Sequence, residues 1–191
     1  MALTNLKVQL RQEAKQLRML FSRDEIIERS FAITKHVSQT FNFSNQCISC
    51  FLSIETLGEV ETPPLIENLS NKNQMFVPVS NFLDGTMEQV PYQPGDELVL
   101  NQFQIPEPRN KCFPIEPEEL DVMFIPLLHA DLKGNRLGYG RGFYDRYLAR
   151  CRPDLIKIGL NLLEPIISVP NESTDVRLSY LITPNGIYKF E

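Results

Sequence analysis

Residues 131–148 read D-L-K-G-N-R-L-G-Y-G-R-G-F-Y-D-R-Y-L, and this stretch decides the fold class of the chain. It follows a predicted buried strand at 120–125 and opens a predicted helix at 143–150. A glycine at every second position lets backbone amides turn inward without side-chain obstruction, and the helix start adds a positive dipole there. The stretch therefore predicts a strand, a phosphate-binding turn and a helix. The three glycines are Gly138, Gly140 and Gly142.

Charged side chains flank this glycine turn. Arg136 and Arg141 carry fork-shaped cations that suit phosphate oxygens, and Asp145 stands where a carboxylate can hold a metal ion. A flexible turn with solvated arginines is the alternative, but strand, turn, arginines and helix in this order favour a phosphate site. No Gly-Lys-Ser/Thr follows, so the turn is not a Walker loop. Its spacing also departs from G-x-G-x-x-G, and the strand at 155–160 carries no ribose-binding acid.

Three further helices are predicted. Apolar residues at three- and four-residue steps indicate one helix over 3–21, and Ser22 with Glu25 forms a capping box that starts the next. Thr62-Pro63 begins a short helix that ends near Leu69. We expect buried faces formed by Leu3, Leu6, Leu10, Ala14, Leu17 and Phe21 on the first helix, and by Ile26, Ile27, Phe31, Ile33 and Val37 on the second.

Strands alternate with these helices. Residues 81–117 are rich in proline, glycine and alternating patterns, which indicates hairpins or an excursion from the main sheet. The alternation predicts an α/β fold with a largely parallel sheet and added antiparallel strands. Strands are expected at 46–53, 75–77, 97–100, 120–125 and 155–160, with a terminal pair at 179–183 and 186–190.

The composition fits one globular domain. A chain of 191 residues with 42% hydrophobic content buries one core but is short for two, so residues 1–191 are expected to form a single domain. No apolar run approaches the length of a bilayer, and residues 1–15 do not read as a leader, so neither secretion nor membrane insertion is expected. The net charge of −5 argues against a protein that covers a nucleic-acid backbone.

Four cysteines are too few and too irregularly spaced for a secreted disulfide scaffold, which favours a reducing cytoplasm. Cys47-x-x-Cys50 lies in an apolar run in which residues three apart face opposite sides of a strand. No second C-x-x-C completes a zinc site. We therefore interpret these two cysteines as buried structural thiols.

A row of cations borders the apolar stripe of the first helix: Lys7, Arg11, Lys15 and Arg18. Such a row can lean over a pocket at the edge of a domain. From the row alone, a solvated flank of an amphipathic helix is the favoured interpretation.

The motif R-L-G-x-G-x-G-F-Y-D-R-Y at 136–147 resembles the signature of the 5-formyltetrahydrofolate cyclo-ligase family. Three further features agree in order along the chain: the basic start at 7–11, the segment E-V-E-T at 59–62, and residues 170–175. The resemblance extends over essentially the whole chain. It implies a three-layer α/β/α domain and a cytoplasmic ligase of one-carbon metabolism that acts on 5-formyltetrahydrofolate with ATP and Mg²⁺.

The resemblance also assigns roles to residues. Arg141 and Tyr144 would act in catalysis, and Asp145 and Asp175 would hold magnesium. We expect only the small molecules 5-formyltetrahydrofolate and ATP as partners, with no nucleic acid, membrane or obligate protein partner. ATP would contact Lys7, Arg11, Arg136, Leu137, Gly138, Tyr139, Gly140, Arg141, Gly142, Phe143 and Tyr144, and the folate would contact Leu52, Glu59, Phe143 and Tyr144.

Two positions depart from the family pattern. Phe143 stands where the family often has tyrosine, and Ala130 stands where an aromatic residue usually precedes the aspartate, so no site role is assigned to Asp131. His36 and His129 have no nucleophile nearby in sequence and are expected to be structural or surface residues. Two alternatives stay open: a non-catalytic nucleotide-binding module and, disfavoured by glycine spacing, a nicotinamide oxidoreductase.

Overall fold

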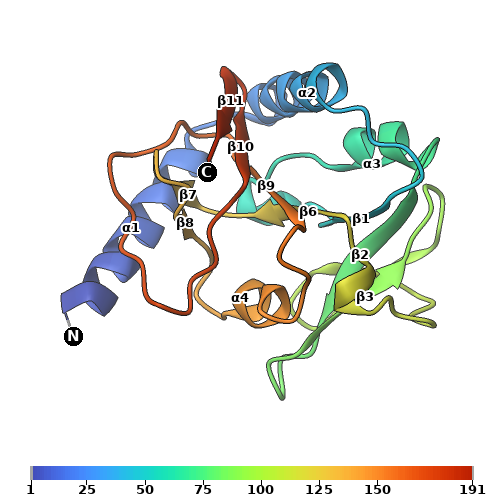
Figure 1. Ribbon diagram of the computed structural model, residues 1–191. Helices are drawn as coiled ribbons and strands as arrows, with labels where there is room; N and C mark the ends of the chain where they lie inside the picture. Colours follow the sequence, from blue (N-terminus) through green and yellow to red (C-terminus); the bar gives the residue numbers. More distant parts are fainter. Residues whose placement is uncertain (1, 191) are drawn as a thin grey trace.

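A computed structural model of the chain describes the backbone of residues 2–190 and the side chains of residues 5–190. Its central sheet consists of β1 (Cys47–Cys50), β2 (Gln74–Ser80), β3 (Met87–Pro91), β6 (Val122–Pro126), β9 (Ile156–Leu160), β10 (Tyr180–Thr183) and β11 (Gly186–Lys189). The strand order is β11-β10-β9-β6-β1-β2-β3, with antiparallel pairing only at the two edges (Figure 1). The predicted sheet, largely parallel with added antiparallel strands, is confirmed.

Helices cover both faces of this sheet. α2 (Arg23–Thr40) and α3 (Pro63–Ser70) pack on one face, and α4 (Phe143–Leu148) packs on the other, which gives the expected three layers (Figure 1). α1 (Ala2–Met19) lies beside the sheet. Within residues 2–190, no helix combines the length and the apolar character needed to cross a membrane.

Two small hairpins lie outside the main sheet. β4 (Leu98–Leu100) pairs with β5 (Pro106–Pro108) in the excursion predicted at 81–117. β7 (His129–Ala130) pairs with β8 (Arg136–Leu137), and α1 packs against this second hairpin. The second hairpin was not predicted because its strands are too short for a period to show. Two 3-10 turns, at Glu55–Leu57 and Pro117–Glu119, complete the structure.

Asp131 is a buried acid with a structural role, because it stabilises the turn of the β7–β8 hairpin. Its carboxylate accepts hydrogen bonds from the backbone of Lys133, Asn135 and Val169 at 2.9–3.0 Å and from the Asn135 amide at 2.8 Å. Burial opposes ionisation, but these bonds more than offset it and lower the pKa of Asp131. His129 is buried nearby, and His36 contacts the Pro184 carbonyl, so both histidines lie outside the pocket described below.

The second helix follows its predicted start but not its whole predicted face. Ser22 accepts a hydrogen bond from the Glu25 amide, and the Glu25 carboxylate accepts one from the Ser22 amide. Ile26, Ile33 and Val37 are buried, whereas Ile27 is exposed and Phe31 is 68% exposed, so the prediction was wrong for those two. Ser30 takes the buried place one turn after Ile26: its hydroxyl donates to the Ile26 carbonyl and accepts from the Glu61 amide.

The face predicted for the first helix was largely wrong. Ala14 is buried, but Leu6 and Leu17 are exposed, and the side chain of Leu3 lies outside the described residues. Leu10 and Phe21 are half-buried. The face of α1 that packs against the protein carries cations instead. This helix lies on the polar ends of strands and on loops, where carbonyl groups need hydrogen-bond donors. Lys7 and Arg11 are half-buried, Arg18 is 3% exposed, and only Lys15 of this row is exposed.

The two cysteines of C-x-x-C face opposite sides of β1 as predicted, but only Cys50 is buried, whereas Cys47 is partly buried. Cys50 packs in the core between the sheet and helices α2 and α3, and Cys47 packs against the core on the α4 side. Both thiols are free. The two side chains therefore point to opposite faces of β1.

We expect Gly159→Ala to destabilise the fold by overpacking. A Cβ at this position of β9 would lie 2.5 Å from Leu127 Cδ2 and 2.7 Å from Leu178 Cδ1, and both leucines are buried. Overpacking of this kind costs about 1–3 kcal/mol in the free energy of unfolding. Gly186→Ala is the control, since no described atom lies within 4 Å of a Cβ built there. Denaturant unfolding measures both variants, and equal midpoints would contradict the packing argument.

Candidate active site

A pocket lies at the topological switch point of the sheet, where the chain turns from one side of the sheet to the other. β1 leads through α3 to β2 on one side, whereas β6 leads through α4 to β9 on the other. Ligand crevices of open α/β sheets form at this kind of switch point, outside the carboxyl ends of the strands. A pocket of about 480 Å³ opens there. Phe51 and Leu52 after β1, Ser80 at the end of β2 and Pro126 at the end of β6 line its floor.

The structure brings together at this pocket every residue for which the sequence predicted a ligand contact. They come from α1, from the segment after β1, from the glycine turn and from the stretch before β10. Their individual roles stay predictions. The set is Lys7, Arg11, Leu52, Glu59, Arg136, Leu137, Gly138, Tyr139, Gly140, Arg141, Gly142, Phe143, Tyr144, Asp145 and Asp175.

The glycine turn has a conformation that favours glycine. Gly140 has φ +94° and Gly142 has φ +69°, a region that L side chains rarely adopt. A Cβ at Gly140 would lie 3.0 Å from Arg11 Cζ, and Arg11 Nε donates to the Gly138 carbonyl at 3.0 Å. The Arg11 side chain therefore holds the turn against α1. α4 has only six residues, shorter than the helix predicted at 143–150, so its dipole contributes less than expected.

Two carboxylates stand at the basic side of the pocket. Asp145 Oδ1 accepts from Arg136 Nη2 at 2.6 Å and from the Val176 amide at 3.2 Å. Asp175 Oδ2 accepts from Lys7 Nζ and from the Glu172 amide, both at 2.8 Å. Burial opposes ionisation of Asp175, but these bonds and the Lys7 charge outweigh it and lower its pKa.

The donor chemistry of this pair suits magnesium. Within the described residues, Asp145 Oδ2 and Asp175 Oδ1 have no hydrogen bond, so each carboxylate keeps one oxygen for a cation. The same residues contain no group of three or more His, Cys, Asp or Glu side chains placed around one metal position. Magnesium usually takes one or two carboxylates and completes its shell with water and substrate phosphates, so two acids fit it.

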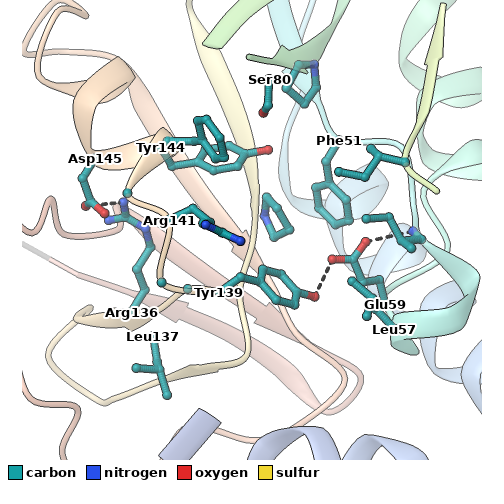
Figure 2. Close-up of a pocket in the computed structure, with 18 of the residues that line it drawn as sticks. Phe51, Leu57, Glu59, Ser80, Arg136, Leu137, Tyr139, Arg141, Tyr144 and Asp145 are labelled. Carbon is teal, nitrogen blue, oxygen red and sulfur yellow. Dashed lines mark hydrogen bonds and ion pairs between the residues drawn. The ribbon is translucent and has the colours of Figure 1, made fainter. Parts of the chain in front are cut away.

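The opposite side of the pocket contains a buried acid. Glu59 is 4% exposed; its Oε1 accepts from the Tyr139 hydroxyl at 2.5 Å and its Oε2 from the Ile54 amide at 2.9 Å (Figure 2). Burial raises the pKa of Glu59, and the two hydrogen bonds and the charge of Arg18 oppose that rise only in part. Burial likewise raises the pKa of Tyr139 well above its usual value, so this phenol is neutral.

Side chains at the start of α4 and in the turn face the cavity. Figure 2 shows Arg141 extending into the cavity from the glycine turn, with the Tyr144 ring beside it. Burial raises the pKa of Tyr144 well above the usual range, so its hydroxyl keeps its proton. Phe143, where the family often has tyrosine, packs its ring edge-to-face against Phe82 at 5.0 Å, and Phe82 contacts Phe103 at 4.0 Å.

The sequence did not predict several residues of this site. Phe82 and Phe103 come from the excursion at 81–117, where no pattern assigned side chains to a pocket. Lys15 also lines the pocket, although it is solvent-exposed. Arg18 was placed on a solvated flank, yet it is buried and donates to the Tyr139 hydroxyl at 3.1 Å. Its place in the cation row does not distinguish it from Lys15, which is exposed, so no local signal revealed its burial.

The chain is similar in sequence to known proteins. The model of the 5-formyltetrahydrofolate cyclo-ligase family matches residues 3–184. The 5-formyltetrahydrofolate cyclo-ligase of Escherichia coli K12 is 34% identical over 151 residues, which cover 75% of this chain and 80% of that protein. That of Haemophilus influenzae is 32% identical over 181 residues, covering 92% and 96%.

Solved structures agree in fold. The NMR structure of 5,10-methenyltetrahydrofolate synthetase from Aquifex aeolicus superimposes with a TM-score of 0.81 at 24% identity, over 97% of this chain and 93% of that one. The family match spans nearly the whole sequence, including the signature at 136–147. The chain therefore belongs to the 5-formyltetrahydrofolate cyclo-ligase family.

Proposed function

We propose that the protein converts 5-formyltetrahydrofolate to 5,10-methenyltetrahydrofolate, consuming ATP with Mg²⁺ and releasing ADP and phosphate. One observation carries the proposal: two groups of residues line the same pocket. The first is the glycine turn, bonded by Arg11, with the two acids Asp145 and Asp175; the second is the buried, hydrogen-bonded pair Glu59 and Tyr139. The first group suits a nucleotide phosphate chain, and the second suits a neutral heterocycle. The family supplies the reaction that needs both ligands at once.

The reaction joins the N5-formyl carbon to N10, and the formyl oxygen has to leave. Because an amide oxygen is a poor leaving group, it first takes the γ-phosphoryl group of ATP, and ADP departs. N10 then attacks the activated carbon, and the oxygen leaves as phosphate when the methenyl bridge forms. Phosphoryl transfer of this kind needs positioning and charge neutralisation more than a protein nucleophile. The absence of a Ser-His-Asp or Cys-His set among the described pocket residues fits this chemistry.

At the phosphate end, Lys7, Arg11 and the amides of the glycine turn would hold the nucleotide. Arg136 donates to Asp145 and to the Val176 carbonyl, so we assign it the further task of fixing that carboxylate. Arg141 has no hydrogen bond from its side chain to another described residue, so it is free to follow the phosphoryl group as charge develops. Magnesium held by Asp145 and Asp175 would neutralise phosphate charge.

At the folate end, Leu52 and Phe143 would supply apolar contact to the pteridine and its neighbouring ring. The Glu59 carboxylate accepts two hydrogen bonds from the protein and retains lone pairs for N–H donors of the ligand. Tyr144 keeps its proton and would donate a hydrogen bond to the formyl oxygen or to the transferred phosphoryl group. These roles place the reacting oxygen between Tyr144 and Arg141.

The first test is turnover. The purified protein should form 5,10-methenyltetrahydrofolate, measured by its absorbance, only when 5-formyltetrahydrofolate, ATP and a divalent ion are all present. Robust turnover without nucleotide would contradict the ligase mechanism. ATP binding with no folate-dependent turnover would instead support the non-catalytic nucleotide-binding module.

Asp145→Asn should raise the magnesium concentration needed for activity and slow catalysis, because the amide keeps an oxygen for Arg136 and Val176 but loses the charge. The substitution should affect catalysis far more than it affects the stability of the fold. Asp24→Asn, at an exposed acid in the first turn of α2, is the matched control. Magnesium titration of the initial rate gives the result, and an unchanged magnesium dependence would remove Asp145 from the metal site.

Arg11→Ala should weaken ATP binding by about 1.5–3 kcal/mol, the range for a charged hydrogen bond, or roughly ten- to hundredfold. Lys35→Ala, an exposed cation on α2, is the control and should leave the affinity unchanged. Arg18 cannot serve as a control, because it is buried. Calorimetric titration of Mg-ATP measures both variants, and equal affinities would leave the glycine turn to hold the nucleotide without α1.

A further inference from the structure

Arg18 is a buried cation without a direct acidic partner. Its guanidinium donates to the Leu127 carbonyl, to Asn161 Oδ1 at 3.1 Å and to the Tyr139 hydroxyl at 3.1 Å. None of the carboxylates in the described part of the chain forms a salt bridge with it. Burying an unpaired charge costs several kcal/mol, so a countercharge is expected close by.

Glu59, which the Tyr139 phenol bridges to Arg18, supplies that countercharge when its carboxyl group is ionised. Arginine keeps its proton at any ordinary pH and can only donate, and an ionised carboxylate can only accept. The Tyr139 hydroxyl therefore accepts from Arg18 Nη1 and gives its single proton to Glu59 Oε1, which fixes the direction of both hydrogen bonds. Arg18 and Glu59 are both almost fully buried, and Tyr139 bridges them.

We infer that Arg18 is a positioning residue of the folate site: through the Tyr139 hydroxyl, it keeps the Glu59 carboxylate ionised and oriented toward the pocket. Arg18 itself does not line the pocket, whereas Tyr139 and Glu59 do. The chain of bonds links the last turn of α1 to the glycine turn and to the segment after β1. It thereby couples the folate end of the pocket to the turn proposed to hold the nucleotide. The inference rests on the proposed folate contact of Glu59.

The surroundings of Glu59 set the sign of the effect. Burial raises its pKa, while the hydrogen bonds from Tyr139 and the Ile54 amide and the positive charge of Arg18 lower it. Tyr144 also faces Glu59, from α4, and is neutral. Removing the Arg18 charge leaves burial less opposed, so the pKa of Glu59 rises further. The acid then stays protonated to a higher pH, and activity on the acidic side is lost.

The experiment compares Arg18→Met and Tyr139→Phe with the parent. At saturating Mg-ATP, the acidic limb of kcat/KM for 5-formyltetrahydrofolate should move up by about one pH unit in each variant, the lower end of the effect of a neighbouring charge. The double variant should shift by less than the sum of the two single shifts, because both changes break one chain of interactions. Arg18→Lys keeps the charge and should recover part of the shift. Lys35→Met is the control and should leave the profile unchanged.

A second readout needs no turnover. The carboxyl ¹³C shift of labelled Glu59, assigned with Glu59→Gln, reports its titration directly in the free protein. A raised midpoint in both Arg18→Met and Tyr139→Phe supports the inference even if the parent proves inactive, an outcome that would refute only the proposed function. An unchanged Glu59 midpoint, with only thermal stability lowered, would reduce Arg18 to a structural residue. If Arg18→Met does not fold, Tyr139→Phe decides, because it leaves the Arg18 bonds to Leu127 and Asn161 in place.

Discussion

The rest of the structure depends on the topological switch point between β1 and β6. From there, β1 connects to β2 on one side and β6 connects to β9 on the other. Because α3 covers one face of the sheet and α4 the other, neither of these two helices covers the carboxyl ends of β1 and β6. Backbone groups there cannot pair within the sheet and need other partners. The Leu127 carbonyl, directly after β6, takes its hydrogen bond from Arg18. The crevice and the cation that borders it thus have the same origin.

This origin also explains why α1 buries cations instead of leucines. A helix that packs on an apolar sheet face needs an apolar stripe, as Ile26, Ile33 and Val37 provide on α2. A helix that packs on strand ends and on a glycine turn meets carbonyl oxygens and carboxylates. Arg11 reaches the Gly138 carbonyl, and Lys7 reaches Asp175. The half-exposed leucines of α1 then lie toward solvent because its polar seam faces the protein.

How far the sequence predicts this molecule depends on the range of each interaction. Local signals gave the capping box at Ser22, the start of α3 at Pro63 and the strand–turn–helix unit of the glycine turn. The residues expected at the pocket followed from a family signature, and the structure gathers them around one cavity. Burial of Arg18 could not be predicted, because its partners Leu127, Tyr139 and Asn161 lie more than 100 residues away along the chain. Periodicity reports which residues share a helix face, but not which face the protein covers.

The acids of the pocket differ in environment, and that difference divides the site. Lys7 and a backbone amide lower the pKa of Asp175, which suits an acid that stays charged beside a cation and phosphates. Burial raises the pKa of Glu59, which suits an acid that meets a neutral ligand through hydrogen bonds. Paired titratable groups whose surroundings push their pKa values apart commonly mark distinct roles. Although the net charge of the chain is −5, its basic side chains Lys7, Arg11, Lys15, Arg136 and Arg141 all line this one pocket, so the proposed nucleotide would meet local positive charge.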